Sequence, residues 1–231
     1  MTPNPDWFDR LPTRPLAEFS LWSANLLALD ADLIRVGNLV DLYHIDVADG
    51  HFAPALLYFP DLVAALRKRS AIPFHVHLMC QDAVLMAQID QFAEAGADLI
   101  SVHAENANAA LAVTHIRALG LRAGVVLKLE TPVAVAAPLV EQLDFLTLLG
   151  TRIGVKGQGL DPSATARLQE AKALIARRAN PARCVLAADG GIREETVPLL
   201  VKAGAETVVM GSLAYGAPDL SARIGWLRGL T

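Results

Sequence analysis

The sequence contains little cysteine and no long apolar or basic run. Of its 231 residues only two, Cys80 and Cys184, are cysteine. This excludes the disulfide framework of many small secreted domains and suits a reducing compartment. The net charge of −4 argues against a nucleic-acid partner. No apolar run is long enough to span a membrane, and the first residues contain no apolar signal-peptide core. We therefore expect a cytoplasmic protein with no membrane partner.

Proline is concentrated near the N-terminus, whereas apolar residues are abundant throughout. Pro3, Pro5, Pro12 and Pro15 fall within residues 1–18, and proline at this density resists both helix and sheet. We therefore interpret residues 1–18 as an N-terminal arm and residues 19–231 as a single domain. Hydrophobic residues make up 53% of the chain, which is enough for a large core.

From Phe19 onward, short apolar runs alternate with amphipathic segments of helical length. This alternation predicts an α/β fold whose parallel sheet is buried on both faces. Eight repeats favour a (β/α)8 TIM barrel. A doubly wound open sheet is the alternative, but no G-x-G-x-x-G motif follows the first strand. The predicted strands are Ser20–Asn25, Leu42–Val47, Phe74–Leu78, Leu99–His103, Arg122–Leu127, Phe145–Leu149, Cys184–Ala188 and Thr207–Met210, and one of the predicted helices covers Val133–Gln142.

Ionisable side chains occur where several predicted strands end. His44 and Asp46 are two residues apart, so their side chains point to the same face of a strand, and His77 and Asp189 end other strands. In a barrel these four side chains would face one mouth, where barrel enzymes carry their chemistry. Imidazole and carboxylate ligands suit Zn, Fe, Mn or Co without choosing among these ions. A single such histidine more often makes a local polar contact, so the predicted site depends on their joint occurrence.

Two of these carboxylates are also candidates for proton transfer. Asp46 and Asp189 could act as base and acid on opposite faces of a substrate, a geometry that inverts a carbon centre. Asp49 is followed by glycine, and we assign it to a turn because Asp-Gly is common there. His75 and His103 are expected to be core residues or to lie behind the ligands.

Glycine-rich segments follow the sixth, seventh and eighth predicted strands. Barrel enzymes often bind phosphate with loops after the last strands, and glycine lets backbone N–H groups approach an anion closely. Each glycine taken alone would be assigned to a tight turn, so this prediction also depends on the group. The candidates for phosphate binding are Gly154, Lys156, Gly157, Gly190, Gly191, Gly211 and Ser212.

These segments resemble a known family, the ribulose-phosphate 3-epimerases. The stretch His44–Phe52 reads H-I-D-V-A-D-G-H-F and matches the family's H-x-D-V-M-D-G-x-F at all but one position. Val76–Met79 and Asp189–Ile192 also match, and the resemblance covers most of the chain from about Phe19 onward.

The resemblance implies a barrel that binds one divalent metal ion through His44, Asp46, His77 and Asp189. It implies Asp46 as the base and Asp189 as the acid of a 3-epimerase, acting through an enediolate. The implied substrate is a ketose phosphate, such as ribulose 5-phosphate or xylulose 5-phosphate, or a related sugar phosphate. Val155 joins the phosphate-binding positions, and a homo-oligomer is expected.

The implied substrate pocket departs from the family pattern at several positions. Its members are Ala24, Ala48, Met79 and Leu149. Ala24 aligns with a usual serine, and Ala48 and Leu149 align with usual methionines. Lys156 lies in a loop that reads R-I-G-V-K-G-Q in place of N-P-G-F-G-G-Q. These departures lead to the hypothesis that the chemistry is retained while the preferred sugar phosphate differs.

Two other functions are alternatives on the same barrel. A phosphate-barrel decarboxylase or lyase would use D-x-K-x-x-D, but the stretch here is Asp46-Val47-Ala48-Asp49 and lacks the lysine. A non-catalytic sugar-phosphate-binding protein would tolerate the altered loops. It would not need both carboxylates and both histidines, which favours the enzyme.

Overall fold

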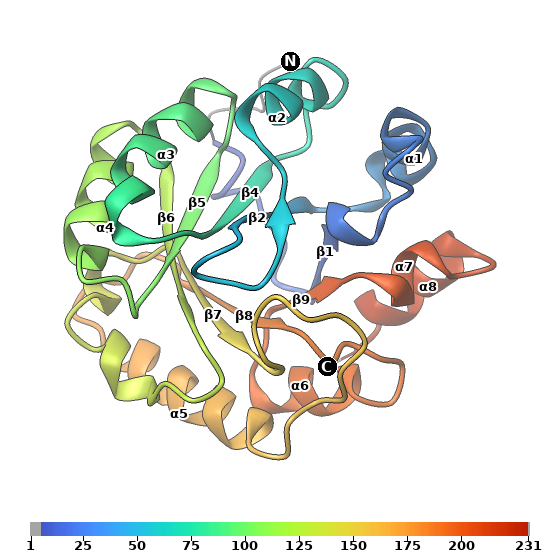
Figure 1. Cartoon of the computed structure of the whole chain (residues 1–231). Coiled ribbons are helices and arrows are strands. Elements are labelled where there is room, and N and C mark those ends of the chain that lie inside the picture. Colours follow the sequence, from blue (N-terminus) through green and yellow to red (C-terminus); the bar gives the residue numbers. More distant parts are fainter. Residues whose placement is uncertain (1–5, 231) are drawn as a thin grey trace.

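The computed structural model describes residues 6–230 and is a closed (β/α)8 barrel (Figure 1). Its strands pair in parallel, and β1 pairs with both β9 and β2, which closes the ring. A short strand, β3 (Leu56–Leu57), pairs antiparallel with the end of β2. The barrel strands are β1 (Leu16–Ser20), β2 (Leu42–Asp49), β4 (Phe74–Met79), β5 (Leu99–His103), β6 (Arg122–Leu127), β7 (Phe145–Leu149), β8 (Val185–Asp189) and β9 (Thr207–Met210).

Helices surround the ring of strands (Figure 1). They are α1 (Leu29–Val36), α2 (Pro60–Arg67), α3 (Asp82–Glu94), α4 (Ala109–Ala118), α5 (Ala164–Ala176), α6 (Val197–Ala203), α7 (Ser212–Tyr215) and α8 (Leu220–Arg228). The helix predicted over Val133–Gln142 is wrong. Two short 3-10 turns, Val133–Ala136 and Val140–Gln142, replace it, because Pro138 between them has no N–H to continue a helix. Among residues 6–230, no helix is both long and apolar enough to cross a membrane.

The first strand begins at Leu16, so the strand predicted at Ser20–Asn25 is also wrong. The chain leaves the sheet after Ser20 and forms a 3-10 turn over Leu21–Ser23. The strand is hard to find in the sequence because a charged residue, Glu18, lies at its centre and is fully buried. The barrel therefore includes residues that the predicted boundary at residue 18 assigned to the arm.

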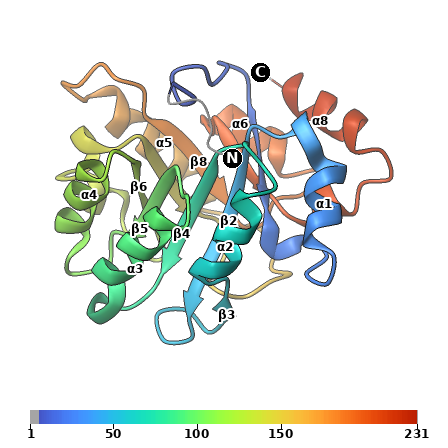
Figure 2. The same cartoon turned by 90° about the horizontal axis from the view of Figure 1, so that it is seen from above.

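The segment before β1 lies at the amino ends of the strands, at the opposite end of the barrel from β3 (Figure 2). Phe8 is buried there with Leu16, Leu42 and Phe145. Arg183 donates hydrogen bonds to the backbone carbonyls of Leu11 and Pro12 at 2.8 and 3.0 Å, which holds the segment in place. The first five residues of the predicted arm lie outside the described part of the chain.

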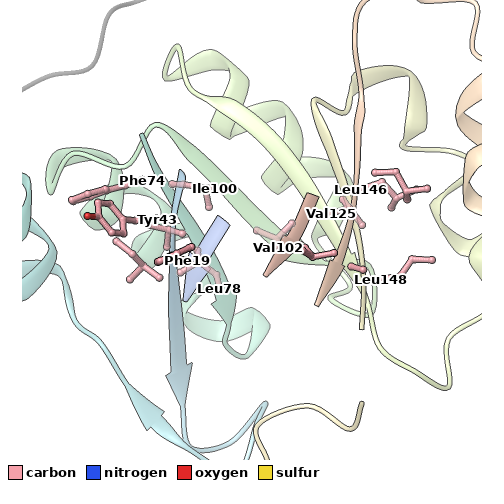
Figure 3. Close-up of a cluster of buried hydrophobic side chains, with 14 of the residues drawn as sticks. Phe19, Tyr43, Phe74, Leu78, Ile100, Val102, Val125, Leu146 and Leu148 are labelled. Carbon is pink, nitrogen blue, oxygen red and sulfur yellow. The ribbon is translucent and has the colours of Figure 1, made fainter. Parts of the chain in front are cut away.

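Side chains alternate along each strand between the helices and the barrel interior. Figure 3 shows the outward set, in which Phe19, Tyr43, Phe74 and other apolar side chains form the main core. The inward set is apolar at the amino end and polar in the next layer. That second layer is buried and consists of Glu18, His44, His75, Ser101, Thr147 and Thr207.

Candidate active site

The four side chains predicted to bind a metal meet at the carboxyl ends of three strands. Nε2 of His44 and Nδ1 of His77 lie 3.2 and 3.3 Å from the same oxygen of Asp46. A carboxylate oxygen of Asp189 lies 4.0 and 3.9 Å from these two nitrogens. One donor atom of each residue thus falls within 4.8 Å of the others. The parallel register produces this arrangement, because Asp46 on β2 is directly beside His77 on β4.

The donor atoms fit a divalent cation. Nε2 of His44 and Nδ1 of His77 are buried and have no hydrogen-bond partner among the described residues. A buried, unpaired polar nitrogen is costly, and a metal ion between these atoms would remove that cost. Two imidazoles and two carboxylates form a mixed nitrogen and oxygen set that suits Zn, Fe, Mn or Co.

The other ring nitrogen of each histidine is held by a buried partner on a neighbouring strand. Nδ1 of His44 lies 2.7 Å from a carboxylate oxygen of Glu18. Nε2 of His77 lies 2.9 Å from Nε2 of His103, whose Nδ1 lies 2.9 Å from Glu105. Because both carboxylates accept, the network assigns protons to Nδ1 of His44, Nδ1 of His103 and Nε2 of His77. When both rings are neutral, the two nitrogens that face the site carry a lone pair.

The two carboxylates at the site have opposite pKa shifts. Burial alone would raise the pKa of Asp46, but the adjacent imidazoles of His44 and His77 outweigh it and hold the pKa well below the usual range. Burial raises the pKa of Asp189 to about 6, and the charge of Asp46 adds to this effect. Burial would also lower the pKa of His44, but Asp46 and Glu18 raise it well above the ordinary value.

A cavity of about 430 Å³ opens beside these four side chains. Met79 and Leu149 line it, whereas the other two predicted pocket residues, Ala24 and Ala48, lie outside its lining. Ser20 lines it instead of Ala24, because β1 ends at Ser20, and its hydroxyl donates to Asp46 at 2.8 Å. All the predicted phosphate-binding positions line the same cavity: Gly154, Val155, Lys156, Gly157, Gly190, Gly191, Gly211 and Ser212.

At least one of these glycines is required by the packing of two loops. Gly191 has a positive φ of 69°, and a Cβ at this position would lie 2.7 Å from the Cα of Leu160. A side chain here would separate the loop after β8 from the loop after β7. Gly191 also lines the cavity.

Three cationic side chains line the cavity, and only Lys156 was among the predicted residues. The others are Arg152 and Arg193. Nζ of Lys156 donates to the backbone carbonyl of Trp22 at 2.6 Å and lies 4.7 Å from the Trp22 ring centroid. Lys156 thus joins the loop after β7 to the turn after β1. Arg152 begins the R-I-G-V-K-G-Q segment, and its charge beside the glycines was the signal that could have identified it.

The remaining polar predictions agree with local contacts. Asp49 accepts hydrogen bonds from the backbone N–H groups of His51, Phe52 and Gln81, as expected for a turn residue. His75 and His103 are fully buried, one below and one beside the four-residue cluster.

The fold and the site define a (β/α)8 barrel whose mouth holds a candidate metal centre beside a cavity lined by glycine-rich loops. Residues 16–215 match the model of the ribulose-phosphate 3 epimerase family, and the chain belongs to that family. It is 36% identical to ribulose-phosphate 3-epimerase of Bacillus subtilis (strain 168) over 210 residues, covering 87% of this chain and 95% of that protein. It is 31% identical to the chloroplastic ribulose-5-phosphate-3-epimerase of Arabidopsis thaliana, covering 89% of this chain and 73% of that protein.

Solved structures with other names share the fold. The 3-keto-L-gulonate-6-phosphate decarboxylase of Vibrio cholerae O1 biovar El Tor str. N16961 superposes with a TM-score of 0.72 at 20% identity, covering 94% of this chain and 96% of that one. A 3-hexulose-6-phosphate synthase superposes with a TM-score of 0.66 at 21% identity, covering 93% and 99%. At these identities the likeness concerns the barrel alone.

Proposed function

We propose that the chain is a metal-dependent isomerase that inverts C3 of a ketose phosphate by proton transfer between two carboxylates. The observation that carries the proposal is the meeting of two carboxylates, Asp46 and Asp189, with two unpartnered imidazole nitrogens in one cluster at the mouth of the barrel. Family membership supports the same reaction class, because the curated relatives are named as ribulose-phosphate 3-epimerases.

The carboxylates would take the roles of base and acid. Asp46 is ionised at neutral pH and would accept the proton from C3, and Asp189 holds a proton more readily and would return one on the opposite face. An enediolate of the sugar would connect the two half-reactions. A divalent ion held by His44, Asp46, His77 and Asp189 would polarise the ketone and adjacent hydroxyl and so acidify C3. Ser20 donates to the second oxygen of Asp46 and would hold that carboxylate in one orientation.

The other end of the cavity would bind the phosphate. Its lining combines glycine-rich loops with the side chains of Arg152, Lys156 and Arg193, and this mixture of exposed backbone and positive charge suits a dianionic group. We retain the hypothesis that the preferred sugar phosphate differs from ribulose 5-phosphate. It depends on Leu149 and Lys156, because Ala24 and Ala48 lie outside the cavity lining and a serine, Ser20, lines the cavity at the end of the first strand.

The test is exchange of the C3 hydrogen in deuterated buffer, followed by NMR. Metal-loaded protein would be mixed with ribulose 5-phosphate and with other ketose phosphates, beside an Asp189→Asn variant. We expect deuterium at C3 with inversion for the wild type, and loss of inversion for the variant. Ribulose 5-phosphate reacting best by a wide margin would refute the altered preference. Binding of metal and sugar phosphate without any exchange would refute the epimerase and favour a binding protein.

A further inference from the structure

A carboxylate, Glu18, lies in the closed interior of the barrel, in the same buried polar layer as His44. It is fully buried, and one of its oxygens lies 2.7 Å from Nδ1 of His44 and 2.5 Å from Nδ1 of His75. A buried carboxylate is retained only where it is paired and hydrogen-bonded, because its desolvation is costly. An apolar residue would fill this place in an ordinary barrel core. The position of Glu18 against a candidate metal ligand therefore indicates a role at the site.

His44 has a carboxylate beside each of its ring nitrogens. Glu18 faces Nδ1 at 2.7 Å in hydrogen-bond geometry, whereas Asp46 faces Nε2 at 3.2 Å without it. A histidine that binds a metal through one nitrogen keeps its proton on the other. The choice of nitrogen therefore depends on which carboxylate holds that proton. We propose that Glu18 is a positioning residue that keeps the His44 proton on Nδ1, so that Nε2 is free to bind the metal ion.

Glu18 is itself held in place from two sides. His75 donates from Nδ1 to the same oxygen, which leaves its Nε2 to accept from the Ser101 hydroxyl at 2.7 Å. The second oxygen of Glu18 accepts from the hydroxyl of Thr207 at 3.3 Å. Glu18 on β1, His75 on β4 and Thr207 on β9 thus form one buried network inside the barrel. Because the carboxylate cannot turn away, its hydrogen bond to His44 is maintained.

Removal of Glu18 would change which ring nitrogen of His44 carries the proton, in addition to loosening the ring. Nδ1 would then have no acceptor, and the nearest remaining carboxylate is Asp46 beside Nε2. The single proton of a neutral imidazole would move to Nε2, where it occupies the position that the metal needs. Metal binding would have to displace it and leave a buried N–H unpaired, which is costly.

The inference rests on the proposed metal site and is tested by metal affinity. Zinc affinity of the full chain would be measured by competition with a chelator for the wild type, Glu18→Gln and Glu18→Leu. We expect binding about 10-fold weaker with the neutral amide and about 100-fold weaker with leucine, the range found when such supporting partners are removed. Glu206→Gln is the matched control, because it neutralises a carboxylate that pairs with Arg183 at 3.0 Å and does not contact His44, and it should leave affinity within about twofold.

A second readout separates positioning from general loss of stability. In zinc-loaded protein labelled with ¹⁵N histidine, NMR should show a hydrogen-bonded proton on Nδ1 of His44. This signal should shift in Glu18→Gln and be lost in Glu18→Leu, while the unfolding temperature is followed for each variant. If Glu18→Leu does not fold, Glu18→Gln carries the test, because it keeps the size of the side chain. Folded Glu18 variants with wild-type zinc affinity and an unchanged Nδ1 signal would overturn the inference alone. A wild type that binds no zinc would overturn the metal site and the inference together.

Discussion

Nε2 of His77 lies 2.9 Å from Nε2 of His103, and one proton is shared between these two buried rings. Glu105 accepts from Nδ1 of His103 at 2.9 Å, so the shared proton belongs to His77. Each histidine of the candidate metal site is thus supported by a carboxylate, directly for His44 and through an imidazole for His77. The two rings therefore present different nitrogens, Nε2 and Nδ1, to the same place.

Replacing His103 by phenylalanine should weaken metal binding. The new ring keeps its packing against Phe52, whose ring centroid lies 4.8 Å from that of His103, but the N–H of His77 loses its acceptor. We expect affinity to fall by about 10- to 100-fold, measured by chelator competition. His115→Phe is the control, because His115 pairs with Asp90 at 2.6 Å on the exposed side of α4. An equal loss of metal affinity in both variants would contradict the support of His77 by Glu105 through His103.

Ionisation of Glu105 should make the free energy of unfolding depend on pH. Burial would raise its pKa, but hydrogen bonds from His103 and Thr131 outweigh burial and lower the pKa to about 2 from 4.5. The folded pKa is depressed, so the contribution to stability is present above pH 4.5 and is lost as the pH falls toward 2. Urea unfolding of the wild type and Glu105→Gln should differ most at about pH 7 and least at about pH 3. A difference that does not change with pH would refute this assignment.

The alternation of apolar runs and helical segments was sufficient to predict the barrel, because it reflects local periodicity. The strand ends also placed His44, Asp46, His77 and Asp189 at one mouth. The first strand was misplaced because local pattern counts Glu18 against a buried strand, whereas its partners His44 and His75 are supplied by other strands.

The contacts that support the site could not be read from the sequence, because they join distant segments. His77 and His103 are 26 residues apart, and Lys156 and Trp22 are 134 residues apart. Strand register and barrel closure create both pairs. One local signal does indicate a polar face toward the barrel interior. Polar residues recur at every second position of an otherwise apolar strand, as Glu18 and Ser20 do in β1.

Gly124 should be intolerant of a side chain because of the polar layer. A Cβ at this position would overlap the hydroxyl of Ser101 and lie 3.1 Å from the Cβ of Phe145. We expect Gly124→Ala to lower the free energy of unfolding by about 1–3 kcal/mol, measured by urea unfolding. Adding Ser101→Ala should recover part of this loss, because the two sites are in contact. Gly225→Ala on α8, where a Cβ meets open space, should not destabilise. Additive effects of the Gly124 and Ser101 changes would argue against the overlap.

Lys156 should contribute to binding of the substrate phosphate rather than to proton transfer. It lines the cavity, and among residues 6–230 no carboxylate lies within ion-pair distance of its ammonium group. We expect Lys156→Met to raise KM for the preferred ketose phosphate by about tenfold with little change in kcat, because a contact to a non-reacting group is equal in the ground and transition states.

The salt dependence of that effect distinguishes a charge contact from a change of loop structure. The difference in KM between wild type and Lys156→Met should shrink as ionic strength rises, because salt screens an exposed charge. Lys202→Met, which removes an equal charge from the exposed surface of α6, should leave KM unchanged at every salt concentration. Loss of the contact to Trp22 alone would loosen the loop and raise KM without this dependence on salt. A rise in KM that does not depend on salt would therefore mean that Lys156 joins the two loops. Arg152 and Arg193 would then be the cationic side chains that bind the phosphate.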